Sequence, residues 1–285
     1  MFGYTKQAYY KTNTTSKQRI ICETKAKEAV LDIRRIMPRV GTRKLHFMLK
    51  QKFENEQIKV GREKLFSILR REGLLISKRK KYRLTTNSRH WMRKYPDLVK
   101  GLHINCPEQV WAADITWIDT KRGESYLHLI TDVYSKQIMG YILCNDMEAD
   151  STLKALKMAL KNRKYPARLL IHHSDRGAQY CSRKYTQVLM ENNIQISMTE
   201  TGDPYDNAVA ERVNGILKDE FGLDEKIIDL QQAILETEQS INTYNKLRPH
   251  LSCQMLTPNQ MHQQQKLPLK RWKSRYNKPL MKQES

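Results

Sequence analysis

The chain has few of the features that mark secreted, zinc-stabilised or membrane-spanning proteins. Its 285 residues include five cysteines, an odd number, scattered without a Cys-x-x-Cys pair, which argues against a disulfide framework or a zinc site. His103 and Cys106 have a ligand-like spacing, but no second pair lies nearby. No apolar run approaches the roughly 18–20 residues that cross a bilayer. The N-terminal residues also lack the apolar core of a secretory signal. We therefore expect a reducing, cytoplasmic setting and no membrane partner.

Acidic residues are scarce in the first third of the chain. Residues 1–103 contain 27 Lys and Arg against 8 Asp and Glu, which accounts for +19 of the net charge of +21. Residues 104–265 contain 17 against 21, a net charge of −4, whereas residues 266–285 contain seven basic residues and one acidic residue. Lys and Arg side chains release the counterions that condense on phosphates. A basic arm and a basic tail around an acidic core predict an anionic polymer as partner.

Three short amphipathic helices are predicted in residues 23–77. Apolar side chains recur at helical spacing after Glu23, after Gly41 and after Gly61, and Pro38 and Gly73 mark boundaries. Three such helices with tight turns are typical of a helix-turn-helix module. Its candidate DNA contacts are Arg43, Lys44, Arg62, Lys64, Arg70 and Arg71. A basic three-helix bundle that binds a protein is the alternative.

The segments around this module are polar and basic. Residues 1–22 show no sustained period, and residues 78–103 form a basic linker that begins Lys78-Arg79-Lys80-Lys81. A charge run of this kind is usually a solvated linker. Between a DNA-binding module and a catalytic core, however, we expect these four side chains to contact phosphate and to carry little sequence information. Residues 261–285 form a basic C-terminal tail.

From Gln109 onward the pattern changes to strands and helices of an α/β (α+β) domain. Strands are predicted at 110–119, 125–133, 138–144, 168–172 and 194–198. Helices are predicted at 151–161, 183–191 and 207–221, and two more at 223–244 and 255–265. The order βββαβαβα predicts a mixed five-stranded sheet flanked by helices, preceded by the all-α module.

Three carboxylates on separate elements are the candidate site. Asp114 lies in the predicted first strand, Asp175 follows the fourth, and Glu211 falls in the first turns of the helix at 207–221. Hard cations such as Mg²⁺ prefer oxygen ligands, and two ions about 3.5–4 Å apart can clamp an in-line phosphoryl displacement. Spacing alone is weak support, because a chain with 30 acidic residues contains many such triples.

The residues around the carboxylates form recognisable motifs. WxADIT, HSDRGxQY and GDPYDNAxAE, together with DVYSKQIMGY at 132–141 and YNKLRPHLSCQMLTP at 244–258, resemble the core of DDE-type insertion-sequence transposases. Within that family the sequence most resembles the second-frame (OrfB) proteins, and the resemblance covers residues 104–260. The resemblance implies an RNase H-like fold shared with retroviral integrases. It also implies that Asp114, Asp175 and Glu211 are the catalytic residues and bind Mg²⁺ or Mn²⁺, as two ions.

The resemblance further implies the reaction and its partners. Water would cleave the DNA at the element ends, and the 3′-OH would then attack target DNA in a transesterification. The partners would be the terminal inverted repeats, target DNA, further copies of the chain on DNA, and an upstream-frame (OrfA) protein. The setting would be bacterial and nucleoid-associated. Two alternatives remain: an RNase H-like nuclease or resolvase without strand transfer, and a non-catalytic helix-turn-helix regulator.

Several side chains near the motifs have two interpretations. Lys218, two turns after Glu211, could contact a terminal phosphate or be a surface lysine. Asp206 and Asn207 are expected to cap the Glu211 helix. For His172, His173 and Asp132 we favour structural roles over contact with phosphate or metal.

Overall fold

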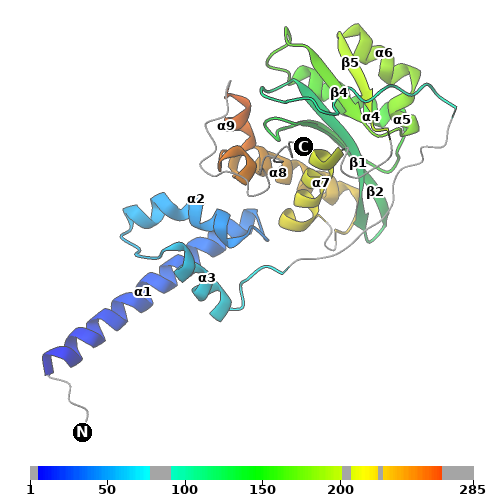
Figure 1. Ribbon diagram of the computed structural model, residues 1–285. Coiled ribbons are helices and arrows are strands. Elements are labelled where there is room, and N and C mark those ends of the chain that lie inside the picture. Colours follow the sequence, from blue (N-terminus) through cyan, green and yellow to red (C-terminus); the bar gives the residue numbers. More distant parts are fainter. Residues whose placement is uncertain (1–5, 78–90, 201–206, 224–226, 265–285) are drawn as a thin grey trace, which may run out of the picture.

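The computed structural model describes residues 6–77, 91–200, 207–223 and 227–264. Three helices, α1 (Lys6–Ile36), α2 (Thr42–Asn55) and α3 (Arg62–Arg71), form an N-terminal module beside the rest of the chain (Figure 1). Apolar side chains of α1, α2 and α3, among them Val30, Leu45 and Leu69, are fully buried against one another. The module therefore has the three-helix organisation predicted from periodicity, while its DNA contacts stay a prediction.

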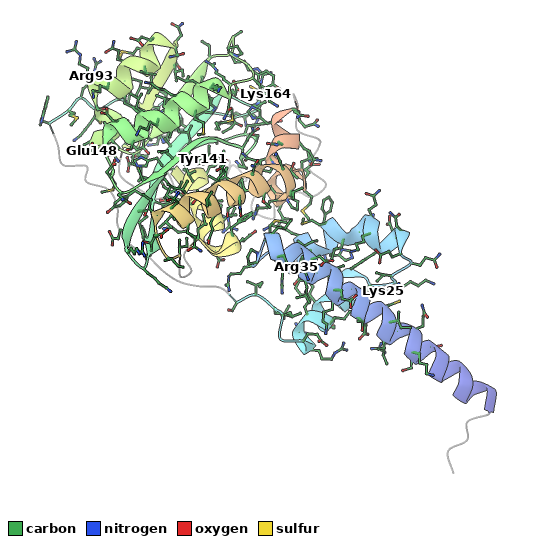
Figure 2. All side chains as sticks on the ribbon, turned by 180° about the vertical axis from the view of Figure 1, so that it is seen from behind. Lys25, Arg35, Arg93, Tyr141, Glu148 and Lys164 are labelled. Atoms are coloured by element: carbon green, nitrogen blue, oxygen red, sulfur yellow. The ribbon has the colours of Figure 1, made fainter. Side chains whose placement is uncertain are left out.

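The first helix is longer than its apolar period predicts. It begins at Lys6, not near Glu23, because no glycine or proline interrupts residues 6–36. Figure 1 shows its first half extending away from α2 and α3, and Figure 2 shows Lys25 and Arg35 along its length, both exposed. Periodicity identifies only the part of a helix that packs on something, so it missed the projecting part.

The remainder forms the predicted mixed sheet. Its strands are β1 (Val110–Thr120), β2 (Gly123–Asp132), β3 (Ile138–Cys144), β4 (Leu170–Ser174) and β5 (Ile194–Met198), in the order β3-β2-β1-β4-β5. The first three are antiparallel, and β4 and β5 run parallel to β1. This confirms the RNase H-like arrangement.

Helices cover both faces of the sheet. The helices α4 (Ala149–Lys161), α5 (Ala178–Cys181) and α6 (Arg183–Glu191) share a core with Ala113, Ile115 and Ile130. On the other face, α7 (Ala208–Phe221) and α8 (Leu230–Leu247) pack on Ile118, Leu127 and Leu129. Successive side chains of a strand point to opposite faces, so Asp114, between Ala113 and Ile115, points toward the α7 face.

Two motif residues other than the three candidate site carboxylates have structural roles. A Cβ added to Gly140 on β3 would lie 2.7 Å from the backbone nitrogen of Ala159, so the glycine lets α4 lie directly against the sheet. Asp132 is fully buried, and its Oδ1 accepts from the backbone N–H of Ser135 at 2.7 Å while its Oδ2 accepts from that of Glu108 at 2.6 Å. These contacts support the structural role predicted for Asp132.

The end of the domain differs from the predicted boundaries. Ile227 forms a bridge with Thr120 at the tip of the β1–β2 hairpin, so α8 begins only at Leu230, where Asp229 caps it by accepting from the backbone N–H of Gln232. A short 3₁₀ turn (Leu251–Cys253) leads to α9 (Pro258–His262), which opens with a Thr257–Gln260 capping box. A strand partner and a cap, not apolar spacing, therefore set these boundaries.

Candidate active site

Asp114 and Asp175 lie side by side because their strands are parallel neighbours. Ala112 of β1 pairs with His173 of β4, and two further residues along each strand bring the chain to Asp114 and Asp175. The backbone N–H of Gly177 donates to Asp175 Oδ1 at 2.9 Å. A Cβ at Gly177 would lie 2.9 Å from that same oxygen, which explains why the tight turn of the HSDRG motif contains glycine.

Glu211 enters the site on the first turn of α7. Asn207 occupies the N-cap position of this helix but makes no capping hydrogen bond. Its amide instead donates to the carbonyl oxygen of Ala113 at 2.9 Å, so the expectation that Asn207 caps the helix with its side chain is wrong. This bond to a strand carbonyl orients the Asn207 side chain and ties the start of α7 to β1 beside Asp114. Asp206, the other expected cap, lies outside the described residues.

Asn214 is a site residue that sequence reasoning missed. Its Nδ2 donates to Asp114 Oδ2 at 2.6 Å, and its side chain is buried under α7. It follows Glu211 by three residues, so one turn of α7 carries both the third carboxylate and a hydrogen-bond donor to the first. A polar residue among mostly apolar positions of the helix was the available signal.

The three carboxylates lie near enough for their charges to affect Asp114. Burial raises the pKa of Asp114 to about 7, and the negative charges of Asp175 and Glu211 add to this effect. Hydrogen bonds from the Ile115 backbone N–H and the Asn214 amide oppose it. Without a cation, carboxylates so close repel one another and one of them holds a proton.

The donor chemistry of this group fits a divalent cation. Three carboxylates offer hard oxygen ligands of the kind that Mg²⁺ and Mn²⁺ prefer, and the raised pKa of Asp114 shows negative charge that a cation would neutralise. Within the part of the chain that the structure describes, no three His, Cys, Asp or Glu side chains are gathered in ligand geometry. The carboxylates of Asp114, Asp175 and Glu211 are thus near one another, but their oxygens are not arranged around a common metal position.

One face of α7 continues from Glu211 toward Lys218. Glu211 and Gly215 are exposed and Lys218 is half-buried, at positions i, i+4 and i+7 of the helix. The Lys218 ammonium lies 3.4 Å from the ring centroid of Trp117 on β1, a cation–π contact that holds a lysine in place. Lys218 is therefore an oriented cation on the same helix face as the third carboxylate.

The two motif histidines lie in the core. The pKa of His172 falls to about 3, first because of burial and then because of the charge on His173, so His172 is neutral and its Nε2 lies 2.8 Å from the Tyr185 hydroxyl. His173 Nδ1 lies 2.8 Å from Ser197 Oγ. Both residues are at most 2% exposed, which supports the structural roles favoured for them.

The predicted DNA contacts of the module differ in their surroundings. Lys44 Nζ lies 2.7 Å from Glu220 Oε1 of α7, and Lys64 and Arg71 both pair with Glu23. Arg43, Arg62 and Arg70 are exposed. Phosphate contact by Lys44 would require its ion pair to break. Lys78, Arg79, Lys80 and Lys81 lie outside the described residues.

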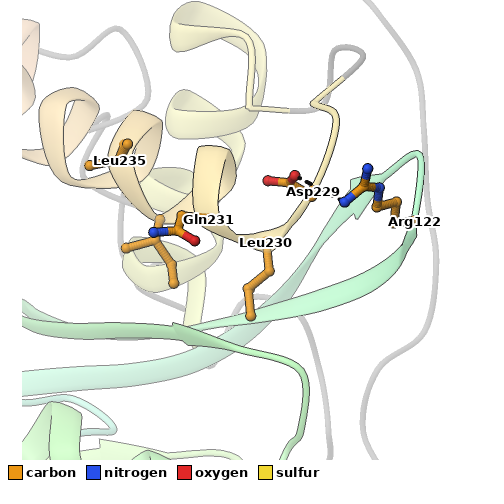
Figure 3. Close-up of a pocket in the computed structure, with 6 residues that line it drawn as sticks. Arg122, Asp229, Leu230, Gln231 and Leu235 are labelled. Atoms are coloured by element: carbon orange, nitrogen blue, oxygen red, sulfur yellow. Dashed lines mark hydrogen bonds and ion pairs between the residues drawn. The ribbon is translucent and has the colours of Figure 1, made fainter.

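A cavity of about 430 Å³ lies away from the carboxylates. It is lined by Arg122, Asp229, Leu230, Gln231, Ile234 and Leu235 (Figure 3). Arg122 sits beyond Thr120, six residues along β1 from Asp114, which is about 20 Å in an extended strand. This cavity is therefore separate from the candidate site, which is recognised by its charged residues.

Comparisons with known proteins agree with this geometry. Two family models, both described as integrase core domain, match residues 104–204 and 192–258. The chain is 33% identical over 267 residues to the insertion element IS600 uncharacterized 31 kDa protein of Shigella sonnei, covering 90% of this chain and 94% of that protein. It is 34% identical over 194 residues to the transposase InsF for insertion sequence IS3A of Escherichia coli (strain K12), covering 67% of each.

A solved structure supports the fold. A chain of the simian T-cell lymphotropic virus intasome, solved in complex with PP2A regulatory subunit B56 gamma, matches with a TM-score of 0.50 and 18% identity. The match covers 83% of this chain and 75% of that chain. No described helix is long and apolar enough to cross a membrane.

The sheet order and the two family matches define an integrase-type core domain. The chain belongs to the family of insertion-sequence transposases that carry this core.

Proposed function

We propose that this protein cleaves the DNA ends of an insertion element and joins the resulting 3′-OH to target DNA. The supporting observation is the proximity of three carboxylates. Asp175 and Glu211 lie close enough to Asp114 that their charges raise its pKa. Family membership supports the same activity. Asp114, Asp175 and Glu211 are the proposed catalytic residues.

The same carboxylates would hold two Mg²⁺ or Mn²⁺ ions. When bound, such ions activate an attacking oxygen and neutralise the charge on the leaving oxygen. The chain's own groups orient the carboxylates: the Asn214 amide holds Asp114, and the Gly177 N–H holds Asp175. Lys218, which lies against Trp117 two turns after Glu211 on the same helix face, would hold a DNA phosphate. No covalent enzyme intermediate is needed, since water and then the 3′-OH are the nucleophiles.

The proposed partner is DNA, both the terminal inverted repeats and the target. The charge of +19 on residues 1–103 supports binding through the module. Arg43, Arg62 and Arg70 are its exposed candidates, and Lys64, Arg71 and residues 78–81 belong to the same proposal. The other proposed partners are further copies of the chain on DNA and an upstream-frame (OrfA) protein.

Strand joining distinguishes this proposal from a nuclease. Incubated with labelled element-end DNA, a target plasmid and Mg²⁺, the protein should give both cut ends and joined products. A pre-cut end whose terminal nucleotide is 3′-dideoxy should abolish joining, because it lacks the attacking 3′-OH, while the protein should still bind this end. Cut ends without joined products, as resolved on sequencing gels, would favour the nuclease reading. Specific binding without any cutting would favour the regulator.

Gly215 offers a test of DNA approach to α7. A Cβ added there would meet no atom of the described residues within 4 Å, yet glycine in a helix interior costs about 1 kcal/mol relative to alanine. Packing does not explain the residue, whereas close passage of a DNA backbone between Glu211 and Lys218 does. Gly215→Ala should therefore raise thermal stability by about 1 kcal/mol but weaken end-DNA binding and cleavage.

The two readouts must move in opposite directions for this interpretation to hold. Calorimetric unfolding gives the stability, and fluorescence anisotropy with labelled end DNA gives the affinity. A stabilised variant with unchanged affinity and cleavage would show that this face of α7 meets only solvent.

A further inference from the structure

Buried ion pairs join the N-terminal module to the catalytic helix. We call Lys44 of α2, Glu220 of α7 and Arg248, just after α8, the joint. Lys44 Nζ lies 2.7 Å from Glu220 Oε1. Arg248 Nε and Nη2 donate to the two oxygens of the same carboxylate, each at 2.8 Å. The three side chains are 13%, 12% and 2% exposed, respectively, so the joint is largely removed from water.

A second set of contacts lies beside the joint. The backbone N–H of Arg39, in the turn between α1 and α2, donates to the carbonyl oxygen of Glu220 at 3.0 Å. The Arg39 guanidinium also lies 3.3 Å from the carboxylate of Asp219. Thus backbone and side chains of one module segment contact two successive residues of α7.

Residues 248–250 (Arg-Pro-His) of the C-terminal motif form the core side of this contact. Arg248 Nη1 lies 2.8 Å from His250 Nε2, which accepts the hydrogen bond because guanidinium nitrogens can only donate. The ring of His250 packs edge-on against Tyr244, with centroids 5.2 Å apart. Tyr244 in turn donates to the carbonyl oxygen of Lys136 at 2.8 Å. Arg248 is therefore fixed to the core before any module residue is considered.

The core alone already satisfies Glu220 with a bidentate Arg248. Lys44 adds a second cation from a residue 176 positions away in sequence. Moving the module would separate the largely buried Lys44–Glu220 ion pair and break the hydrogen bond from the Arg39 backbone N–H to the Glu220 carbonyl oxygen, so the module and α7 favour one relative position. Glu220 follows Glu211 by nine residues, about 14 Å along a rigid helix. The contacts therefore connect the module to the helix that carries the third carboxylate.

We propose, on the basis of the transposase function above, that the joint sets the register between the DNA-binding module and the active site. The element sequence bound by the module then determines which phosphodiester reaches Asp114, Asp175 and Glu211. Lys44, Glu220 and Arg248 are positioning residues in this scheme: they act on the site through α7 and the module. The charge of Lys44 serves this contact.

The position of the cut on end DNA tests the proposal. Glu220→Gln in the full chain removes the charge that attracts Lys44 but keeps a side chain of the same shape. Wild type should cut element-end DNA predominantly at one phosphodiester, and the variant should spread its cuts over neighbouring bonds. Sequencing gels of end-labelled DNA with Mg²⁺ give the distribution directly. A residue that only stabilises the fold would lower all cutting and leave the distribution unchanged, and that result would overturn the proposal.

Glu108→Gln is the matched control. Glu108 is also a buried, ion-paired carboxylate, but its partners Arg163 and His262 both belong to the core. The Glu108→Gln variant should be less stable than wild type but should still cut at a single phosphodiester. Spread cutting in this control as well would show that lowered stability, not the joint, broadens the distribution.

A charge exchange beside the joint decides the matter if Glu220→Gln does not fold. Asp219→Lys places a cation against Arg39 and should spread the cuts, and adding Arg39→Glu should restore the single position. Spread cutting without restoration would overturn the proposal. If wild type cuts no end DNA under any condition, the transposase function itself fails, and the inference fails with it.

Discussion

Asn at Asp114 or Asp175, or Gln at Glu211, should abolish cleavage and joining while leaving specific binding of end DNA largely intact. Each substitution keeps the shape of the side chain but removes the charge that would hold a cation. We expect cleavage to fall by more than about 100-fold, the upper end of the range for losing a mere outer-shell partner of a metal ligand. Single-turnover cleavage of labelled end DNA, beside anisotropy for binding, measures both effects. A variant that cuts at near wild-type rate would remove that residue from the catalytic set.

Stability provides the control for Asp114→Asn. The pKa of Asp114 is raised to about 7 in the folded protein, so the unfolded chain releases this proton at lower pH than the folded chain. In metal-free buffer the carboxyl therefore destabilises the fold increasingly as pH rises from about 4 to 7. Asp114→Asn should raise the melting temperature at pH 8 and change it little at pH 4. An inactive variant that is also more stable at pH 8 has lost chemistry, not structure.

Asn214 gives a graded comparison. Its amide holds Asp114 at 2.6 Å without being one of the carboxylates. Loss of such an outer-shell partner typically costs about 10–100-fold in metal affinity or activity. Asn214→Leu should therefore lie between wild type and the carboxylate variants, and excess Mg²⁺ should recover part of its activity.

Removal of divalent cations should abolish cutting and joining altogether. Residues 104–265 carry a net charge of −4, yet they must hold a phosphate chain at a group of carboxylates that already repel one another. Mg²⁺ or Mn²⁺ should restore activity after chelation. Ca²⁺ should support assembly on DNA with little cleavage, because its looser coordination and larger radius hold phosphate oxygens less well.

DNA and metal should also tighten each other's binding. Phosphate oxygens complete the ligands of an ion, and ions neutralise the carboxylates that oppose phosphate, so the coupling is reciprocal. Calorimetric metal titrations with and without end DNA, run beside a metal titration of cleavage, measure it. Full activity in chelator would contradict the carboxylate–metal mechanism. Equal metal affinity in both titrations would contradict only the coupling.

Local sequence was sufficient for the parts of the protein that depend on neighbours in the chain. Period-2 and period-3.6 patterns predicted the five strands and the helices that bury one face, and the motifs identified Asp114, Asp175 and Glu211. The parallel pairing of β1 and β4 then places two of these carboxylates side by side. Secondary structure and motif spacing depend on residues that are close together in the chain, so they can be predicted from a single sequence.

The tertiary structure decided what depends on partners far apart in the chain. Asn214 reaches Asp114 across 100 positions, and Lys44 reaches Glu220 across 176. Lys44 looks like any other basic residue of the module, and nothing near it in sequence shows that a buried carboxylate takes up its charge. Likewise, the Asn207 amide donates to the carbonyl oxygen of Ala113, 94 positions away, an acceptor that only the packing of α7 on β1 brings within reach. Hydrogen bonds and ion pairs act over a few ångströms in space, so a side chain's partner is settled only when the chain has packed.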